Sequence, residues 1–146
     1  MNQDFLDVLG SLLRADTRFL VVGAHALAVH GVPRATGDLD IWISTSSENV
    51  EKVWQAMKDF GAPLEALGVT KADFAAPEMV VQLGLPPRRV DLLTGLSGVE
   101  FEDAWGQRVT HRVTDLDVPF IGRDTLIQNK RATGRLKDLA DLEELG

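Results

Sequence analysis

The 146-residue chain contains no cysteine. It can therefore form no disulfide framework, no thiolate metal site and no thiolate nucleophile, and a reducing cytoplasm is the compartment we expect. Long apolar runs are also missing, since none approaches the roughly 20 residues that a membrane span requires. The N-terminus carries acidic residues in place of the basic start of a secretory signal. These absences predict a cytoplasmic protein with no membrane association.

Basic residues are fewer than acidic ones, and the formal net charge is -7. This balance argues against a protein whose main role is to hold nucleic acid, because that role needs a basic surface to neutralise phosphates. RNA stays open as a substrate, because a local basic face could form from Arg88, Arg89, Arg108 and Arg112 or from residues 130–137. Scattered basic residues are more often simply a solvated surface.

The composition is otherwise that of an ordinary globular protein, with 45% apolar and 25% charged residues. The length suits one domain that buries roughly 70% of its unfolded surface. No internal repeat, low-complexity tract or linker divides the chain. We therefore expect a single domain over residues 1–146.

Hydrophobic periodicity predicts alternating helices and strands. A Thr45-x-x-Glu48 pair fits a capping box at the start of a helix that Gly61 ends. Further helices are expected over residues 3–14, 24–30, 125–132 and 136–145, and strands over residues 18–22, 38–43, 78–83, 88–93, 107–113 and 118–121.

The stretch from Leu20 to Ser44 carries the chemistry. An apolar strand ends at a Gly23-Ala24 turn, a short helix follows, and a second apolar strand carries Asp38 and Asp40. Successive strand side chains point to opposite faces, so these two carboxylates project side by side. They repel each other, and one keeps its proton unless a cation lies between them. A hard divalent ion such as Mg2+ resolves that conflict.

These residues resemble the signature of the nucleotidyltransferase superfamily. Val22-Gly23-Ala24, thirteen residues, and then Asp38-Leu39-Asp40-Ile41 match its pattern of apolar-Gly-Gly/Ser, a spacer, and Asp-apolar-Asp/Glu-apolar. The runs HG..R.TGDLDIWI and IGRDTLIQNKRATGRLKDLADLEEL are similar to small bacterial nucleotidyltransferase-like proteins near the AbiEii/AbiGii toxin group. The likeness covers nearly the whole chain. Ala24 departs from it, because family members usually have Gly or Ser there, and the change removes a hydroxyl donor but not the backbone N–H.

A third acid follows in the strand Arg88–Leu93. Asp91 interrupts an apolar run, and a buried carboxylate without a partner is too costly to be accidental. An ion pair with Arg88 or Arg89 is the plain explanation. The resemblance implies instead that Asp91 lies beside the strand of Asp38 and Asp40 and faces the same metal centre.

The resemblance also implies how a nucleotide binds. Asp38, Asp40 and Asp91 would hold Mg2+ or Mn2+ and act in catalysis, while Gly23 and Ala24 would present backbone N–H groups to the phosphates. The expected cofactor is therefore a divalent metal ion, and the expected partner is a nucleoside triphosphate.

Four further residues would contact the nucleotide. In the family interpretation Arg34 and Thr36 border it, although a loop arginine in water and a threonine that satisfies its own turn explain them equally simply. Lys130 and Lys137 belong to the only concentrated basic patch, which would suit the outer phosphates. Pairing with Asp138, Asp141 and Glu144 at helical spacing is the alternative.

The implied fold is α/β, a nucleotidyltransferase-like mixed central sheet of about five strands flanked by helices. The implied reaction moves a nucleoside monophosphate from the triphosphate to a hydroxyl of a tRNA end, a protein or a small molecule. The protein could be the toxin of a toxin-antitoxin pair, with an antitoxin as partner. Two alternatives stay open: a nucleotide-binding or interaction protein with little turnover, and an aminoglycoside-type small-molecule nucleotidyltransferase.

Overall fold

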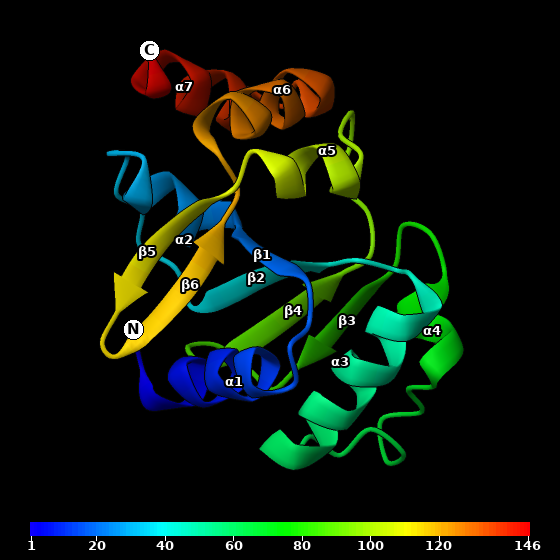
Figure 1. Cartoon of the computed structure of the whole chain (residues 1–146). Helices are drawn as coiled ribbons and strands as arrows, with labels where there is room; N and C mark the ends of the chain where they lie inside the picture. Colours follow the sequence, from blue (N-terminus) through cyan, green and yellow to red (C-terminus); the bar gives the residue numbers. More distant parts are fainter.

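The computed structural model describes residues 1–146 as a mixed sheet flanked by seven helices (Figure 1), which confirms the predicted fold class. The sheet has six strands in the order β3-β4-β2-β1-β6-β5, one more than the approximate five that we expected. The strands are β1 (Phe19–Val22), β2 (Asp38–Ile43), β3 (Val80–Leu83), β4 (Arg89–Leu93), β5 (Val109–Val113) and β6 (Leu116–Phe120). The helices are α1 (Gln3–Arg14), α2 (Gly23–Val29), α3 (Ser47–Phe60), α4 (Lys71–Ala75), α5 (Phe101–Gly106), α6 (Arg123–Thr133) and α7 (Leu136–Leu145).

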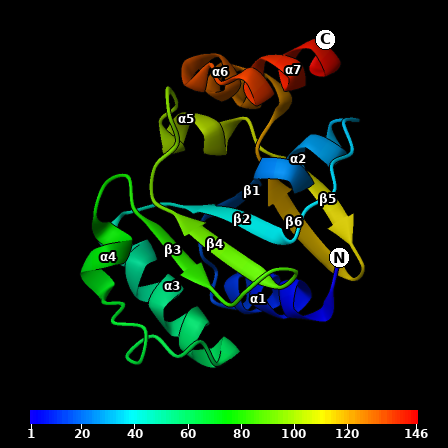
Figure 2. The same ribbon diagram turned by 180° about the vertical axis from the view of Figure 1, so that it is seen from behind.

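Two central strands organise the sheet. β1 and β2 pair antiparallel, and each has a parallel neighbour on its outer side, β6 beside β1 and β4 beside β2. β3 and β5 complete the two edges as antiparallel partners. Helices α1, α3 and α4 lie on one side of the sheet and α2, α5, α6 and α7 on the other (Figures 1 and 2). None of the helices combines the length and the apolar content needed to cross a lipid bilayer.

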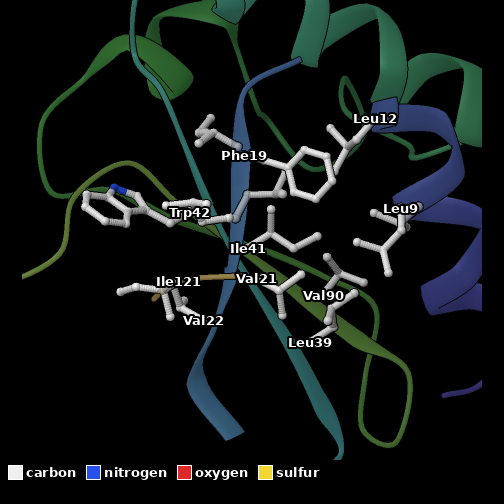
Figure 3. Close-up of a cluster of buried hydrophobic side chains, with 14 of the residues drawn as sticks. Leu9, Leu12, Phe19, Val21, Val22, Leu39, Ile41, Trp42, Val90 and Ile121 are labelled. Carbon is white, nitrogen blue, oxygen red and sulfur yellow. The ribbon is translucent and has the colours of Figure 1, made fainter. Parts of the chain in front are cut away.

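The packing of β2 decides which way its acids face. Leu39 and Ile41 are fully buried and point toward α1, where Leu9 joins the same cluster (Figure 3). Each such side chain contributes about 1.5–3 kcal/mol when it leaves water. Because side chains alternate along a strand, Asp38 and Asp40 must project from the opposite face. The hydrophobic core thus directs both carboxylates toward the side of α2, α6 and α7.

Helix α3 begins one residue later than the sequence predicts. The Ser46 side chain, not Thr45, accepts a hydrogen bond from the Asn49 N–H at 3.3 Å. Gly61 ends the helix as predicted, with a φ of 96° that a residue without a side chain adopts at little cost. Adjacent cap-forming residues at positions 45–47 account for the ambiguity.

Candidate active site

The parallel pairing of β2 with β4 assembles a cluster of charged side chains. In this register Arg89 lies opposite Asp38, and Asp91 lies opposite Asp40. Residues two apart on a strand share a face, so all four side chains project from the same face of the sheet. The three acids singled out in the sequence therefore lie on neighbouring strands. They are accompanied by Arg89, and we call these four residues the strand cluster.

Arg89 bridges two of the acids. Its Nη2 donates a hydrogen bond to Asp38 Oδ2 at 2.7 Å and another to Asp91 Oδ2 at 3.2 Å. Its Nε lies 3.0 Å from Asp91 Oδ1 but is not aligned for a hydrogen bond. Both interpretations of Asp91 therefore describe part of its environment, because it pairs with Arg89 and also neighbours Asp40. The i, i+2 spacing of Arg89 and Asp91 was the sequence signal for this contact.

The strand cluster has more negative than positive charge. Burial, together with the negative charge of Asp91, raises the pKa of Asp40 to about 6. Asp38 Oδ1 and Asp91 Oδ1 are buried without a hydrogen-bond partner. One guanidinium cannot compensate three carboxylates, so the cluster would accept further positive charge.

A divalent metal ion suits the donors but not their present arrangement. Carboxylate oxygens are the ligands that Mg2+ and Mn2+ prefer, and Asp38 Oδ1 and Asp91 Oδ1 accept no hydrogen bond. However, no three His, Cys, Asp or Glu side chains in the structure are placed to hold one ion together. Metal binding by Asp38, Asp40 and Asp91 therefore stays a prediction.

Gly23 shapes the turn against which Asp40 lies. It follows Val22, the cross-strand partner of Asp40, and has a φ of 68°. A Cβ at this position would overlap Asp40 Oδ2. Only glycine satisfies both the left-handed backbone and this close approach. The turn glycine and the acidic strand thus form one structural unit.

A cavity of about 530 Å3 opens beside this unit, a volume typical of small-ligand sites. Asp91 does not line it and is only 8% exposed. The other residues that we singled out all do: Gly23, Ala24, Arg34, Thr36, Asp38, Asp40, Lys130 and Lys137.

Helices α6 and α7 supply the basic part of the cavity lining. Lys130 Nζ lies 3.3 Å from Asp138 Oδ1 and 3.1 Å from Asp141 Oδ2, so Lys130 makes the ion pairs of the alternative interpretation. These pairs join α6 to α7, whereas the sequence suggested spacing within one helix. Arg34 Nη2 contacts Asp141 at 2.8 Å. Lys137 forms no ion pair and is the lining cation available to a ligand.

Thr36 both lines the cavity and satisfies its own turn. Its Oγ1 accepts a hydrogen bond from the Asp38 N–H at 3.1 Å. The threonine therefore braces the start of β2 at the first of the two acids. Contact with a nucleotide would use the methyl group or the remaining lone pair.

A larger cavity of about 890 Å3 lies at the other ends of β1 and β2. Its lining includes Arg18, Trp105 and Arg108, and the two guanidinium carbons lie 5.4 Å and 4.0 Å from the centre of the Trp105 ring. None of the predicted site residues lines it. We favour the smaller cavity as the candidate active site because Asp38 and Asp40, whose negative charge is only partly compensated, line it.

The sequence matches no model of a known protein family, and no curated protein matches it. Among solved structures, a Thermotoga maritima protein described as a "putative nucleotidyltransferase" gives a TM-score of 0.63 at 16% identity, covering 99% of this chain and 94% of that one. ANT(2")-Ia in complex with adenylyl-2"-tobramycin gives 0.60 at 11% identity, covering 99% of this chain and 88% of that one. A likeness at such identities defines the fold alone, and the relation to the AbiEii/AbiGii group stays a prediction. The chain has the nucleotidyltransferase fold.

Proposed function

We propose that this protein is an enzyme that transfers a nucleoside monophosphate from a nucleoside triphosphate to a hydroxyl group. The observation that supports this most is the placement of Asp38 and Asp40 in one cavity with Lys130 and Lys137. Transfer of a phosphoryl-type group depends mainly on positioning and charge stabilisation, which carboxylates and lysines around one cavity provide.

The strand cluster has the catalytic role. Asp38, Asp40 and Asp91 would hold Mg2+ or Mn2+, which when bound neutralises phosphate charge and lowers the pKa of the attacking hydroxyl. Asp91, which lies opposite Asp40 but does not line the cavity, would accept the proton of that hydroxyl once its side chain turns toward the cavity. The backbone N–H groups of Gly23 and Ala24 bind phosphate oxygens. They orient the triphosphate so that its reacting phosphorus faces the acids.

The remaining lining residues bind the nucleotide. Lys137, which has no carboxylate partner, steadies the leaving pyrophosphate, and Lys130 adds positive charge behind its pairs with Asp138 and Asp141. Arg34 and Thr36 border the nucleotide at the start of β2.

The acceptor separates two versions of this function. An RNA end or a protein as acceptor fits a toxin that an antitoxin neutralises, as the resemblance to the AbiEii/AbiGii group implies. An aminoglycoside-type activity is the second candidate, because the fold matches that of ANT(2")-Ia, whose structure contains adenylyl-2"-tobramycin. The net charge of -7 favours a cationic acceptor of this kind over RNA.

Pyrophosphate release tests the proposal. Labelled nucleoside triphosphates are incubated with the protein, Mg2+ or Mn2+, and in turn aminoglycosides, cell RNA and total protein. We expect metal-dependent release that falls at least about 100-fold in Asp40→Asn, with a labelled product in one acceptor class. Asp117→Asn is the matched control, because Asp117 lies outside the 530 Å3 cavity and its side chain is 67% exposed.

Two outcomes would contradict parts of the proposal. A wild-type protein that binds nucleotide but releases no pyrophosphate with any acceptor is a binding protein of the same fold. Full turnover in Asp91→Asn would remove Asp91 from the catalytic group.

A further inference from the structure

Arg89 is the only cation that contacts the acids of the strand cluster. It lies directly opposite Asp38 in the parallel pair and two residues before Asp91 on its own strand. The same Nη2 reaches a carboxylate oxygen of each. Arg89 therefore contacts two of the three side chains that would have to turn toward a common metal ion.

We propose that Arg89 is a resident counter-ion that occupies the acidic site in the metal-free protein, and that a divalent ion binds only when the guanidinium withdraws. This inference rests on the proposed function, because it concerns the metal ion of that site. It explains why donors of suitable chemistry are not arranged to hold an ion together.

Competition follows from the charges and the shared atoms. A guanidinium stays protonated at any ordinary pH, so it cannot escape by losing its charge. Within about 3–4 Å of the same oxygens, a divalent cation and a guanidinium repel strongly. Asp38 Oδ2 and Asp91 Oδ2, which Arg89 occupies, can therefore serve either cation but not both.

The hold of Arg89 is incomplete, which makes its release feasible. Its Nε and Asp91 Oδ1 lie 3.0 Å apart but are not aligned for a hydrogen bond, and Asp38 Oδ1 is buried without a hydrogen-bond partner. Its side chain is 27% exposed and so has a path to solvent. A long side chain can swing outward while the β4 backbone stays in the sheet.

Mn2+ binding to the nucleotide-free protein tests the inference, with free Mn2+ counted by electron paramagnetic resonance. Removing the competitor should raise the apparent affinity, since only the fraction of molecules with a vacated site binds metal. We expect Arg89→Gln to bind Mn2+ about tenfold more tightly than wild type. Arg89→Lys should fall between them, because an ammonium keeps the positive charge but has no counterpart of the Nε that lies 3.0 Å from Asp91 Oδ1.

Arg88→Gln is the matched control. It removes the same charge one residue away, from a side chain that is 68% exposed and lies 3.5 Å from Asp4. Its Mn2+ affinity should equal that of wild type. Melting curves with and without Mn2+ show that each variant is folded, and Arg89→Gln should gain more thermal stability from Mn2+ than wild type does.

Equal or weaker Mn2+ binding in both Arg89 variants would overturn the inference, because Arg89 would then be neutral or would position the acids for metal. The two proposals fail separately. Metal-dependent turnover in wild type with no gain in Arg89 variants would leave the enzyme proposal standing and remove this one. Tighter Mn2+ binding in Arg89→Gln without any turnover in wild type would leave this inference standing and remove the enzyme proposal.

Discussion

Two groups of acidic residues adjoin the same cavity and are compensated to different degrees. In the strand cluster, Asp38, Asp40 and Asp91 share the single guanidinium of Arg89. The second group, which we call the helix cluster, pairs two acids with three cations. Its members are Lys130, Asp138 and Asp141 of the last two helices with Arg34 and Arg135.

The pKa values move in opposite directions. Burial and the negative charge of Asp91 raise the pKa of Asp40. Burial would also raise the pKa of Asp138, but hydrogen bonds from Arg135, Thr133 and Lys130 outweigh it and leave that pKa well below its ordinary value. Burial acts in the same direction on both acids, so the supply of hydrogen-bond donors decides whether the pKa rises or falls.

This contrast separates a structural ion network from a candidate functional site. The helix cluster joins α6, α7 and the Arg34 loop, and its buried Asp138 is fully partnered. The strand cluster retains buried oxygens that accept no hydrogen bond and an acid whose pKa is raised, at a cost that folding alone does not require. Unsatisfied charge of this kind marks places where a ligand completes the site.

The largest expected effect is on stability, from Asp138→Ala. Asp138 is fully buried and pairs with Lys130, whose side chain is only 10% exposed, so the substitution leaves a buried ammonium short of a partner. We expect the free energy of unfolding to fall by about 3–5 kcal/mol, measured by urea denaturation. Asp117→Ala, which breaks an exposed pair with Arg112, should cost less than about 1 kcal/mol. Equal losses in both variants would mean that the helix cluster is no more than a surface network.

The next effect links the turn to the strand cluster. Gly23→Ala places a methyl group against Asp40 Oδ2 and forces alanine to a φ of 68°. We expect a loss of about 2–4 kcal/mol in denaturant unfolding. Gly31→Ala is the control, because its φ is 92° and nothing lies within 4 Å of the added Cβ. It should lose only about 1–2 kcal/mol, from the backbone alone. Equal losses would show that Asp40 moves aside freely.

The smallest effect is a gain in stability. Because folding raises the pKa of Asp40 to about 6, ionising this acid costs more in the folded than in the unfolded chain. Stability should therefore fall as pH rises from about 4 to 6 and stay low above that range. Asp40→Asn should stabilise the metal-free protein by about 1–2 kcal/mol at pH 8, with the gain lost near pH 4.

Unfolding measured across this pH range checks the expected gain. The helix cluster should show the opposite trend at lower pH, because the lowered pKa of Asp138 adds stability that is fully present above about pH 4 and is lost as the pH falls below it. A constant difference between wild type and Asp40→Asn at all pH values would contradict the raised pKa of Asp40.

Much of the cavity lining could be predicted from the sequence because its residues belong to short, local sequence patterns. The alternation around Leu39 set the common face of Asp38 and Asp40, and the turn glycine is followed directly by a helix. The lysines near the C-terminus were singled out because they belong to the only concentrated basic patch of an acidic chain. The Thr45 cap was wrong because neighbouring serines compete for the same role.

The sequence alone determined which side chains share a face, since a strand alternates its side chains whatever surrounds it. It also determined that Asp91 needs a partner, since a buried carboxylate cannot stay isolated. Only the tertiary structure decided which cations the acids receive. Arg89 meets Asp38 across 51 positions of sequence and Arg34 meets Asp141 across 107. Such pairings depend on the register of β2 with β4 and on how α7 packs. Neither of these can be inferred from a local sequence pattern.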